Sequence, residues 1–167
     1  RPFYQSTEFL FMDRTNEEAY AKFISHHFSA YQKKLKTEAL ESIFEYTRLH
    51  TFYVQLLCHK LFTQTEKEIS HEVVSRTLHD ILIENETYYY GYKNLITEQQ
   101  WNLLKAIAKE KFVLKINQKD FLNKYDLSAS SVQRSIKALE ERELIVLETA
   151  GYRVYDVFFG LWMSFLF

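Results

Sequence analysis

Residues 127–156 read LSASSVQRSIKALEERELIVLETAGYRVYD, and this stretch decides the fold of the chain. Ser128 is a good helix N-cap, because a serine hydroxyl can accept a hydrogen bond from a free backbone N–H of the first turn. Val132, Ile136 and Leu139 follow at intervals of four and three residues, which places them on one face of an α-helix. The opposite face carries Ser130, Arg134, Lys137 and Glu141. The pattern predicts an amphipathic helix that begins after Ser128.

The same stretch continues with the pattern of a β-hairpin. Residues 143–148, ELIVLE, alternate and contain β-branched and long apolar side chains, as a half-buried strand does. Ala150-Gly151 is the turn signal, and residues 152–155 are predicted to form the returning strand. A helix followed by a hairpin is the second half of a winged helix, so the first half should lie just upstream.

Residues 93–126 supply that first half. Thr97 to Gln100 form a capping box, and a helical stripe of apolar residues follows from Trp101. Residues 111–116 are predicted as a short strand and residues 119–125 as a short helix. The order helix, strand, helix, turn, helix, hairpin predicts a winged helix-turn-helix over residues 93–167.

Residues 1–92 are predicted to form a separate, helical domain. Four helices are expected at 17–28, 37–48, 52–62 and 71 to about 90, with a polar loop at 32–36. Their predicted caps are Asn16, Thr37, either His50 or Thr51, and Ser70. Gly91 is predicted to end the fourth helix, which puts the domain boundary near residues 91–95. Residues 1–12 are strand-like and are interpreted as the tail of an upstream domain.

The composition agrees with a mainly α protein: a helical lid-like bundle followed by a winged helix-turn-helix with a small β-hairpin. Only three Gly and one Pro occur in 167 residues, which favours long helices and few tight turns. The net charge of −1 provides no global attraction to nucleic acid. A single cysteine, Cys58, fits a reducing compartment, and we expect a cytoplasmic protein.

The last residues, 157–167, form an apolar run, VFFGLWMSFLF. A membrane-spanning helix needs about 20 apolar residues, so this run is too short to cross a bilayer and no membrane partner is expected. The run is too apolar to remain exposed. It is predicted to pack on the core of this chain or to dock on a protein partner.

Several segments together resemble a known family. TEQQWNLLKAIAKE, LSASSVQRSIKALEERELI and YRVYDVFFGLW resemble the C-terminal winged helix of prokaryotic AAA+ and STAND-type ATPases, the archaeal-type ATPases among them. STEFLFMDRTNEEAYAKFISHHF and YTRLHTFYVQLLCHKLF are similar to the helical lid that follows the ATPase core in that family. The resemblance covers nearly the whole chain. It implies a longer parent protein, with an upstream core that binds ATP and Mg²⁺.

The resemblance also implies a place near the nucleotide. The loop that approaches nucleotide in such lids reads Gly-His-Pro or Gly-x-Pro, and the matching positions here are Leu49, His50 and Thr51. Only His50 agrees, so the alternative is that His50 and Thr51 simply break and cap a helix. The chain has no phosphate-binding loop of the pattern G-x-x-x-x-G-K-[ST], and we expect it not to be an enzyme by itself.

DNA contact is the second possibility for this winged helix. The candidate residues lie on the predicted outer face of helix 129–141 and beside the wing: Ser130, Ser131, Gln133, Arg134, Lys137 and Arg153. Residues 97–156 carry ten Lys and Arg against nine Asp and Glu, whereas a dedicated DNA binder shows a basic stripe. DNA contact and a protein-facing regulatory role therefore both remain open.

Three functions follow from these patterns. The first is a regulatory and interaction segment of an AAA+/STAND-type protein. The second is a stand-alone winged-helix transcription regulator whose helical half serves for dimerisation, and the third is a scaffold that docks through residues 157–167. Catalytic residues and a metal site are not expected, because the histidine spacings are incomplete and no nucleophile motif occurs.

Overall fold

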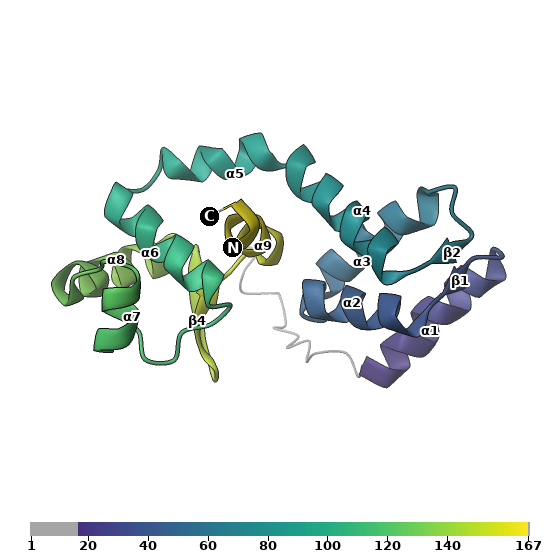
Figure 1. Cartoon of the computed structure of the whole chain (residues 1–167), viewed down its shortest axis with the longest axis horizontal. Helices are drawn as coiled ribbons and strands as arrows, with labels where there is room; N and C mark the ends of the chain where they lie inside the picture. Colours follow the sequence, from purple (N-terminus) through teal and green to yellow (C-terminus); the bar gives the residue numbers. More distant parts are fainter. Residues whose placement is uncertain (1–16, 167) are drawn as a thin grey trace, which may run out of the picture.

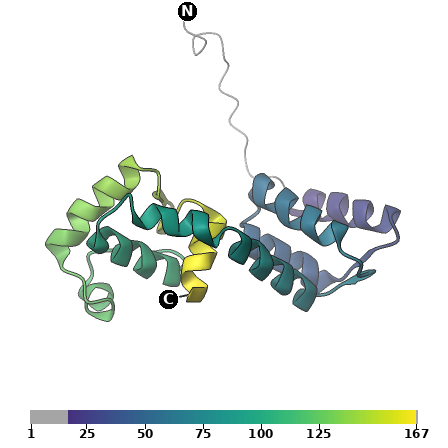
Figure 2. The same cartoon turned by 90° about the horizontal axis from the view of Figure 1, so that it is seen from above.

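The computed structural model describes residues 17–166, which form a mainly helical molecule with two lobes (Figures 1 and 2). The predicted tail at 1–12, the cap at Asn16 and the last residue, Phe167, lie outside the described residues. One lobe is a bundle of four helices, and the other contains a winged helix. Helix α9 (Val157–Leu166) lies at the junction of the two lobes (Figure 2).

The bundle contains α1 (Glu17–Ala30), α2 (Thr37–Thr47), α3 (Thr51–Thr63) and α4 (His71–Glu84). The expected helices are all present, and α2, α3 and α4 pack against one another. Their core is made of aliphatic and aromatic side chains spaced for one helix face. Its members include Ile24, Phe28, Ile43, Val54, Leu57, Leu61, Val74 and Leu78.

The prediction of a plain loop at 32–36 was wrong. Strand β1 (Lys34–Leu35) pairs in parallel with β2 (Glu68–Ile69). The N–H of Lys34 donates to the carbonyl of Lys67 at 2.7 Å, and the N–H of Lys36 donates to the carbonyl of Ile69 at 3.0 Å. Strands of two residues are too short to produce an alternating pattern, so the sequence could not reveal them.

The fourth predicted helix is two helices, because α4 ends at Glu84 and α5 (Glu86–Lys93) follows. Asn85 separates them, and its side-chain amide donates to the carbonyl of Ile81 at 2.7 Å. Asparagine side chains compete in this way with the helix backbone. Gly91 lies inside α5 and does not end a helix, contrary to the prediction. Helix α5 continues to Lys93, which lies inside the range 91–95 where the domain boundary is predicted. The boundary itself stays a prediction.

The side-chain caps predicted for α2, α3 and α4 do not form. Thr37 is the first residue of α2, whose N-cap is Lys36. His50 and Ser70 occupy the N-cap positions of α3 and α4, but neither side chain makes a capping hydrogen bond. The Ser70 hydroxyl instead donates to the carboxylate of Glu72 at 2.9 Å.

The second lobe follows the predicted winged-helix order. It contains α6 (Glu98–Lys109), α7 (Lys119–Lys124), α8 (Ala129–Glu141) and the antiparallel pair β3 (Ile145–Glu148) and β4 (Gly151–Val154). The capping box of Thr97 and Gln100 is confirmed at the start of α6. Val132, Ile136 and Leu139 are buried, and α8 packs on α6, as the opening pattern predicts.

Two details of the wing differ from the prediction. The strand expected at 111–116 is reduced to a single bridge, in which Val113 and Tyr152 exchange backbone hydrogen bonds of 2.8 and 3.0 Å. Gly151 belongs to β4 and not to the turn, which consists of Thr149 and Ala150. Gly151 has a φ of 120°, and a Cβ there would lie 2.5 Å from backbone atoms of Val113 and Leu114. Only glycine permits this close approach.

Helix α9 joins the two lobes. It contacts α2 and α4 of the bundle and α6 and β4 of the winged helix. The carboxylate of Asp156 caps α9 by accepting from the N–H of Phe159 at 2.9 Å. Figure 1 shows α5 passing over α9, and four ring contacts connect them, among Tyr89, Tyr90, Tyr92, Phe159 and Trp162. One hydrophobic cluster therefore includes residues of both lobes.

Candidate functional site

Helix α8 is fixed at its start by local hydrogen bonds. The Ser128 hydroxyl accepts from the N–H of Ser131 at 3.3 Å, which confirms the predicted cap. The turn before α8 contains a hydrogen bond from the N–H of Leu127 to the carbonyl of Leu122 at 2.8 Å. In this turn Asp126 has a φ of 51°, in the left-handed region. Asp residues tolerate this conformation better than most. The turn sets the angle between α7 and α8.

The outer face of α8 is exposed and polar. Ser130, Gln133, Arg134 and Lys137 lie in solvent. The Arg134 Nε donates to the carbonyl of Ser130 at 3.3 Å, and the Lys137 ammonium lies 3.9 Å from the carboxylate of Glu141. Such exposed contacts are weak, so both cations can turn toward a partner at small cost.

Of the five residues predicted on this face, Ser131 is not on it. Ser131 is buried, and its hydroxyl donates to the carbonyl of Ser128 at 3.0 Å. It lies one turn before Ser135, which is also buried, so both belong to the covered side of α8.

Arg153, predicted beside the wing, lies in β4. The side chain of Arg153 is only 16% exposed, and its guanidinium lies 3.0 Å from the carboxylate of Glu148. The ring of Phe112 lies over the same guanidinium and helps to cover it.

Apart from Lys137, the lysines of this lobe lie on segments other than α8. They follow the end of α6, the segment after it, and α7: Lys105, Lys109, Lys111, Lys115, Lys119 and Lys124. The far end of α8 is acidic, because Glu140, Glu141 and Glu143 are exposed there. A duplex that meets the outer face of α8 would therefore meet both charge signs.

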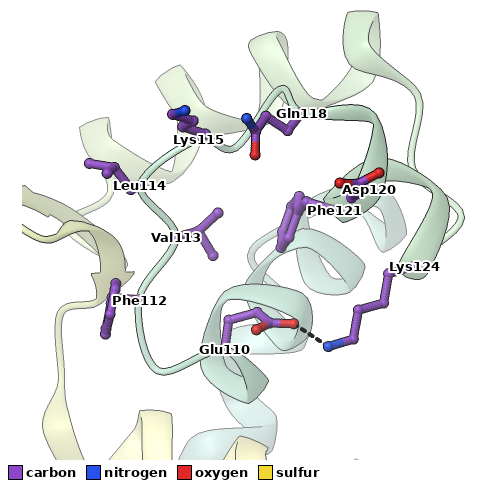
Figure 3. Close-up of a pocket in the computed structure, with 9 residues that line it drawn as sticks. All are labelled: Glu110, Phe112, Val113, Leu114, Lys115, Gln118, Asp120, Phe121 and Lys124. Carbon is purple, nitrogen blue, oxygen red and sulfur yellow. Dashed lines mark hydrogen bonds and ion pairs between the residues drawn. The ribbon is translucent and has the colours of Figure 1, made fainter.

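Figure 3 shows a hollow of about 390 Å³ between the segment after α6 and helix α7. Val113 and Phe121 point into it, and Lys115 lies at its rim. The Lys124 ammonium and the Tyr125 hydroxyl both donate to the Glu110 carboxylate, each at 2.6 Å. These hydrogen bonds, with that from Lys124 first, lower the pKa of Glu110. The hollow is closed on one side by its own ion pair and contains no catalytic arrangement of side chains.

The two residues predicted to lie near nucleotide are in the bundle. His50 is exposed at the start of α3, and its ring lies 5.1 Å from that of Tyr53. Thr51 is half-buried, and its side chain hydrogen-bonds to Tyr20. Thr51 is therefore occupied within the bundle, and His50 is the residue of this pair that a ligand could reach.

Most residues of the apolar run at 157–166 pack inside this chain. Val157, Phe158, Phe159, Trp162 and Met163 are buried between the two lobes. Tyr53 lies against Phe158 with ring centroids 4.7 Å apart. Burial raises the pKa of Tyr53, and the charge of Asp156, to which the Tyr53 hydroxyl hydrogen-bonds, raises it further. The prediction that this run packs on the core of the chain or docks on a partner is confirmed in its first alternative, and among residues 157–166 only Phe165 and Leu166 are exposed.

Metal binding and thiol chemistry have little support in this geometry. Among residues 17–166, no group of three or more His, Cys, Asp or Glu side chains is placed to hold a metal ion. Burial raises the pKa of the Cys58 thiol to about 12, so the side chain is a neutral thiol at pH 7. None of the helices in the described part of the chain has the length and apolar character to span a membrane.

The comparison with protein families agrees with this geometry. Residues 87–165 match a family model described as a "probable winged helix domain". The second lobe is therefore a winged helix domain, a class of fold compatible with binding DNA or protein. No curated protein and no solved structure matches the chain.

Proposed function

We propose that this chain is the regulatory and interaction segment of a longer ATP-binding protein of the AAA+/STAND type. In this proposal the bundle is the lid of an upstream ATPase core, which holds ATP and Mg²⁺. The winged helix then contacts DNA or a protein partner. The family resemblance of the sequence supports the ATPase parent, and fold-level likeness alone would not be enough to assign it.

The position of α9 is the observation that carries the regulatory part of the proposal. Residues of α9 fall within the matched range 87–165, yet the helix packs on α2 and α4 of the bundle. Packed interfaces between helices transmit rigid-body movement because they have few intermediate arrangements. A movement of the bundle that follows the nucleotide state would be passed to the winged helix through α9.

The test begins with the gene upstream of Arg1. We expect it to encode a phosphate-binding loop, and we expect the full-length protein to bind MgATP. Hydrogen–deuterium exchange of the full-length protein should then differ in α9 between the ATP-bound and the nucleotide-free state. An upstream sequence without such a loop, or exchange in α9 that is identical in both states, would contradict the proposal.

A second function, DNA binding by a stand-alone transcription regulator with a helical dimerisation domain, is favoured by the exposed face of α8. Arg134 and Lys137 can neutralise phosphates, while Ser130 and Gln133 can hydrogen-bond to bases or phosphates. The test is binding of a short duplex at several salt concentrations. Each of Arg134→Ala and Lys137→Ala should lower the salt slope by about one.

The matched control for these variants is Lys67→Ala, because Lys67 is exposed beside β2 in the other lobe. It should leave duplex binding unchanged. No binding of duplex even at low salt would remove this second function. The role of a dimerisation domain is tested separately, by measuring the mass of the chain in solution.

A further inference from the structure

A second surface, separate from the outer face of α8, lies at the junction of the lobes. A groove of about 290 Å³ is formed where the end of α2, the end of α6, strand β4 and helix α9 meet. The described residues that line it include four cations and one carboxylate: Arg48, Lys109, Lys111, Arg153 and Glu45. Its walls are apolar, with Tyr46, Phe112, Leu161 and Phe165. The groove is therefore both cationic and aromatic.

The two arginines of the groove are held in position by the fold. The Arg48 Nη1 donates to the carbonyl of Val154 at 3.3 Å, and Arg153 forms its ion pair with Glu148. The Nε of Arg153 is buried and has no hydrogen-bond acceptor among the described residues. Buried donors of this kind are rare in folded proteins.

The backbone at the groove includes the ends of two helices. Arg48 and Leu49 have φ values of 52° and 58° at the end of α2, and Lys111 has a φ of 62° after α6. The left-handed conformation is common where an α-helix ends, and Arg48 is the C-cap of α2. On α9, a Cβ at Gly160 would lie 3.2 Å from Val154 Cβ and 3.7 Å from Arg48 Nη2. Glycine at this position leaves space for the Val154 side chain, whereas 3.7 Å from Arg48 is an ordinary contact distance.

The aromatic wall of the groove is accessible. Phe112 is 47% exposed and Phe165 is 58% exposed, which is high for large apolar side chains, and both line the groove. The Arg153 guanidinium lies 5.8 Å from the centre of the Phe112 ring. An apolar side chain of a partner could pack on these rings while its carboxylates meet the cations.

The hollow of Figure 3 provides an internal comparison. It shares Phe112 with the groove, but its two lysines, Lys115 and Lys124, are balanced by Glu110 and Asp120. In the groove, Glu45 lies 3.2 Å from Lys111 and Glu148 lies 3.0 Å from Arg153, so two carboxylates offset two of the four cations. An excess of positive charge therefore distinguishes the groove from the neighbouring hollow, and favours an anionic partner.

We propose that this groove is a docking site for an acidic peptide segment of a partner protein, a segment that carries a large apolar side chain between Asp or Glu residues. The carboxylates meet Arg48, Lys109 and Lys111, and the apolar side chain packs on Phe112 and Phe165, which line the same groove. None of the lining residues belongs to α8. The site also needs no residue of an upstream ATPase core, because all of its residues belong to this chain. A bound segment would touch both lobes and fix their relative position.

The test uses the whole chain and a fluorescein-labelled peptide, Glu-Asp-Phe-Glu-Leu-Asp, in fluorescence anisotropy. We expect saturable binding that weakens as salt is added. Lys109→Glu should weaken it about tenfold, since a contacting charge is reversed. Phe112→Ser should weaken it about fivefold through the lost apolar contact. Both residues are exposed, so both variants are expected to fold.

Matched controls separate the groove from general effects. Lys67→Glu changes the same charge in the bundle, and Leu95→Ser removes an exposed apolar side chain before α6; each should change affinity by less than about twofold. A peptide in which serine replaces the phenylalanine and leucine tests the apolar part, and one in which lysine replaces the acids tests the charge. Each is expected to bind at least about fivefold more weakly.

Three results would overturn the proposal. The first is the absence of saturable binding of the acidic peptide at low salt. The second is equal affinity of the control and groove variants, which would place the peptide elsewhere. The third is displacement of the peptide by a short DNA duplex whose own affinity falls with Lys109→Glu, because the groove would then be a nucleic-acid site.

Discussion

Gly151 shows how one residue sets the geometry of the wing. Its φ of 120° and the close approach of the Val113 backbone leave no space for a side chain. The bridge between Val113 and Tyr152 depends on that approach, and it attaches the segment after α6 to the hairpin. The same segment forms one wall of the cationic groove, so a change at Gly151 would affect the groove as well.

Gly151→Ala should therefore lower the free energy of unfolding by about 2 kcal/mol or more, from a strained φ and a backbone clash. The measurement is urea denaturation followed by circular dichroism. Gly91→Ala is the matched control, because Gly91 lies in α5 and a methyl group added there would meet no neighbouring atom within 4 Å. That change should raise the stability by about 0.5–1 kcal/mol. Equal effects of the two substitutions would contradict this account.

Glu110 gives the lobe a pH dependence in acid. Its pKa lies below the ordinary value of 4.5, so its hydrogen bonds stabilise the fold above pH 4.5. This stabilisation is lost as the pH falls through the lowered pKa. Glu110→Gln should therefore flatten the decrease in melting temperature below pH 4.5, and Tyr125→Phe should flatten it by a smaller amount. A decrease as steep as in the unchanged protein would contradict the assignment.

Among the elements, α8 follows most directly from its sequence. A capping serine, a regular apolar stripe and a polar opposite face all agree, and such agreement is what specifies a structure. The bundle helices could be predicted from the same periodicity. The two-residue strands β1 and β2 could not be predicted, because their pairing depends on segments that are far apart in the chain. The break at Asn85 was missed because the apolar pattern continues on both sides of it.

The two serines at N-cap positions allow a direct test at this scale. Ser128→Ala removes a hydroxyl that accepts from the N–H of Ser131, and should cost about 1 kcal/mol of stability. Ser70→Ala removes a hydroxyl that makes no capping hydrogen bond, and should cost less than about 0.5 kcal/mol. Urea denaturation of both variants provides the comparison. If Ser70→Ala lowered the free energy of unfolding as much as Ser128→Ala, the N-cap position alone, and not the capping hydrogen bond, would determine the loss.

At the scale of the whole molecule, α9 makes the two lobes interdependent. Phe158 is buried and contacts Tyr53 of the bundle, so Phe158→Ala should lower the free energy of unfolding by about 3–5 kcal/mol. Phe165→Ala, at an exposed position of the same helix, should change it by less than about 0.5 kcal/mol. Tryptophan fluorescence and far-ultraviolet circular dichroism should report one transition for the unchanged protein. Two separate transitions would contradict the interdependence of the lobes.

The candidate sites could be predicted from the sequence only where they lie on one element. Ser130, Gln133, Arg134 and Lys137 share a helix face, and helical spacing is enough to place them outside. Arg153 lies in the wing as predicted, but strand alternation does not say which face of a small sheet is covered, so its low exposure could not be predicted. The cationic groove could not be predicted, since its lining comes from α2, α6, β4 and α9, and only the packing of α9 brings these together.

The order of synthesis adds a constraint that follows from the place of α9. The ribosome makes Val157–Leu166 after every other described element, but α2 and α4 need it to cover their apolar faces. The bundle therefore leaves the exit tunnel with an uncovered apolar surface, and about seventy more residues are made before α9 begins. Chaperones that recognise exposed apolar segments should meet this chain during translation, and a nascent chain stopped at Asp156 should stay bound to them.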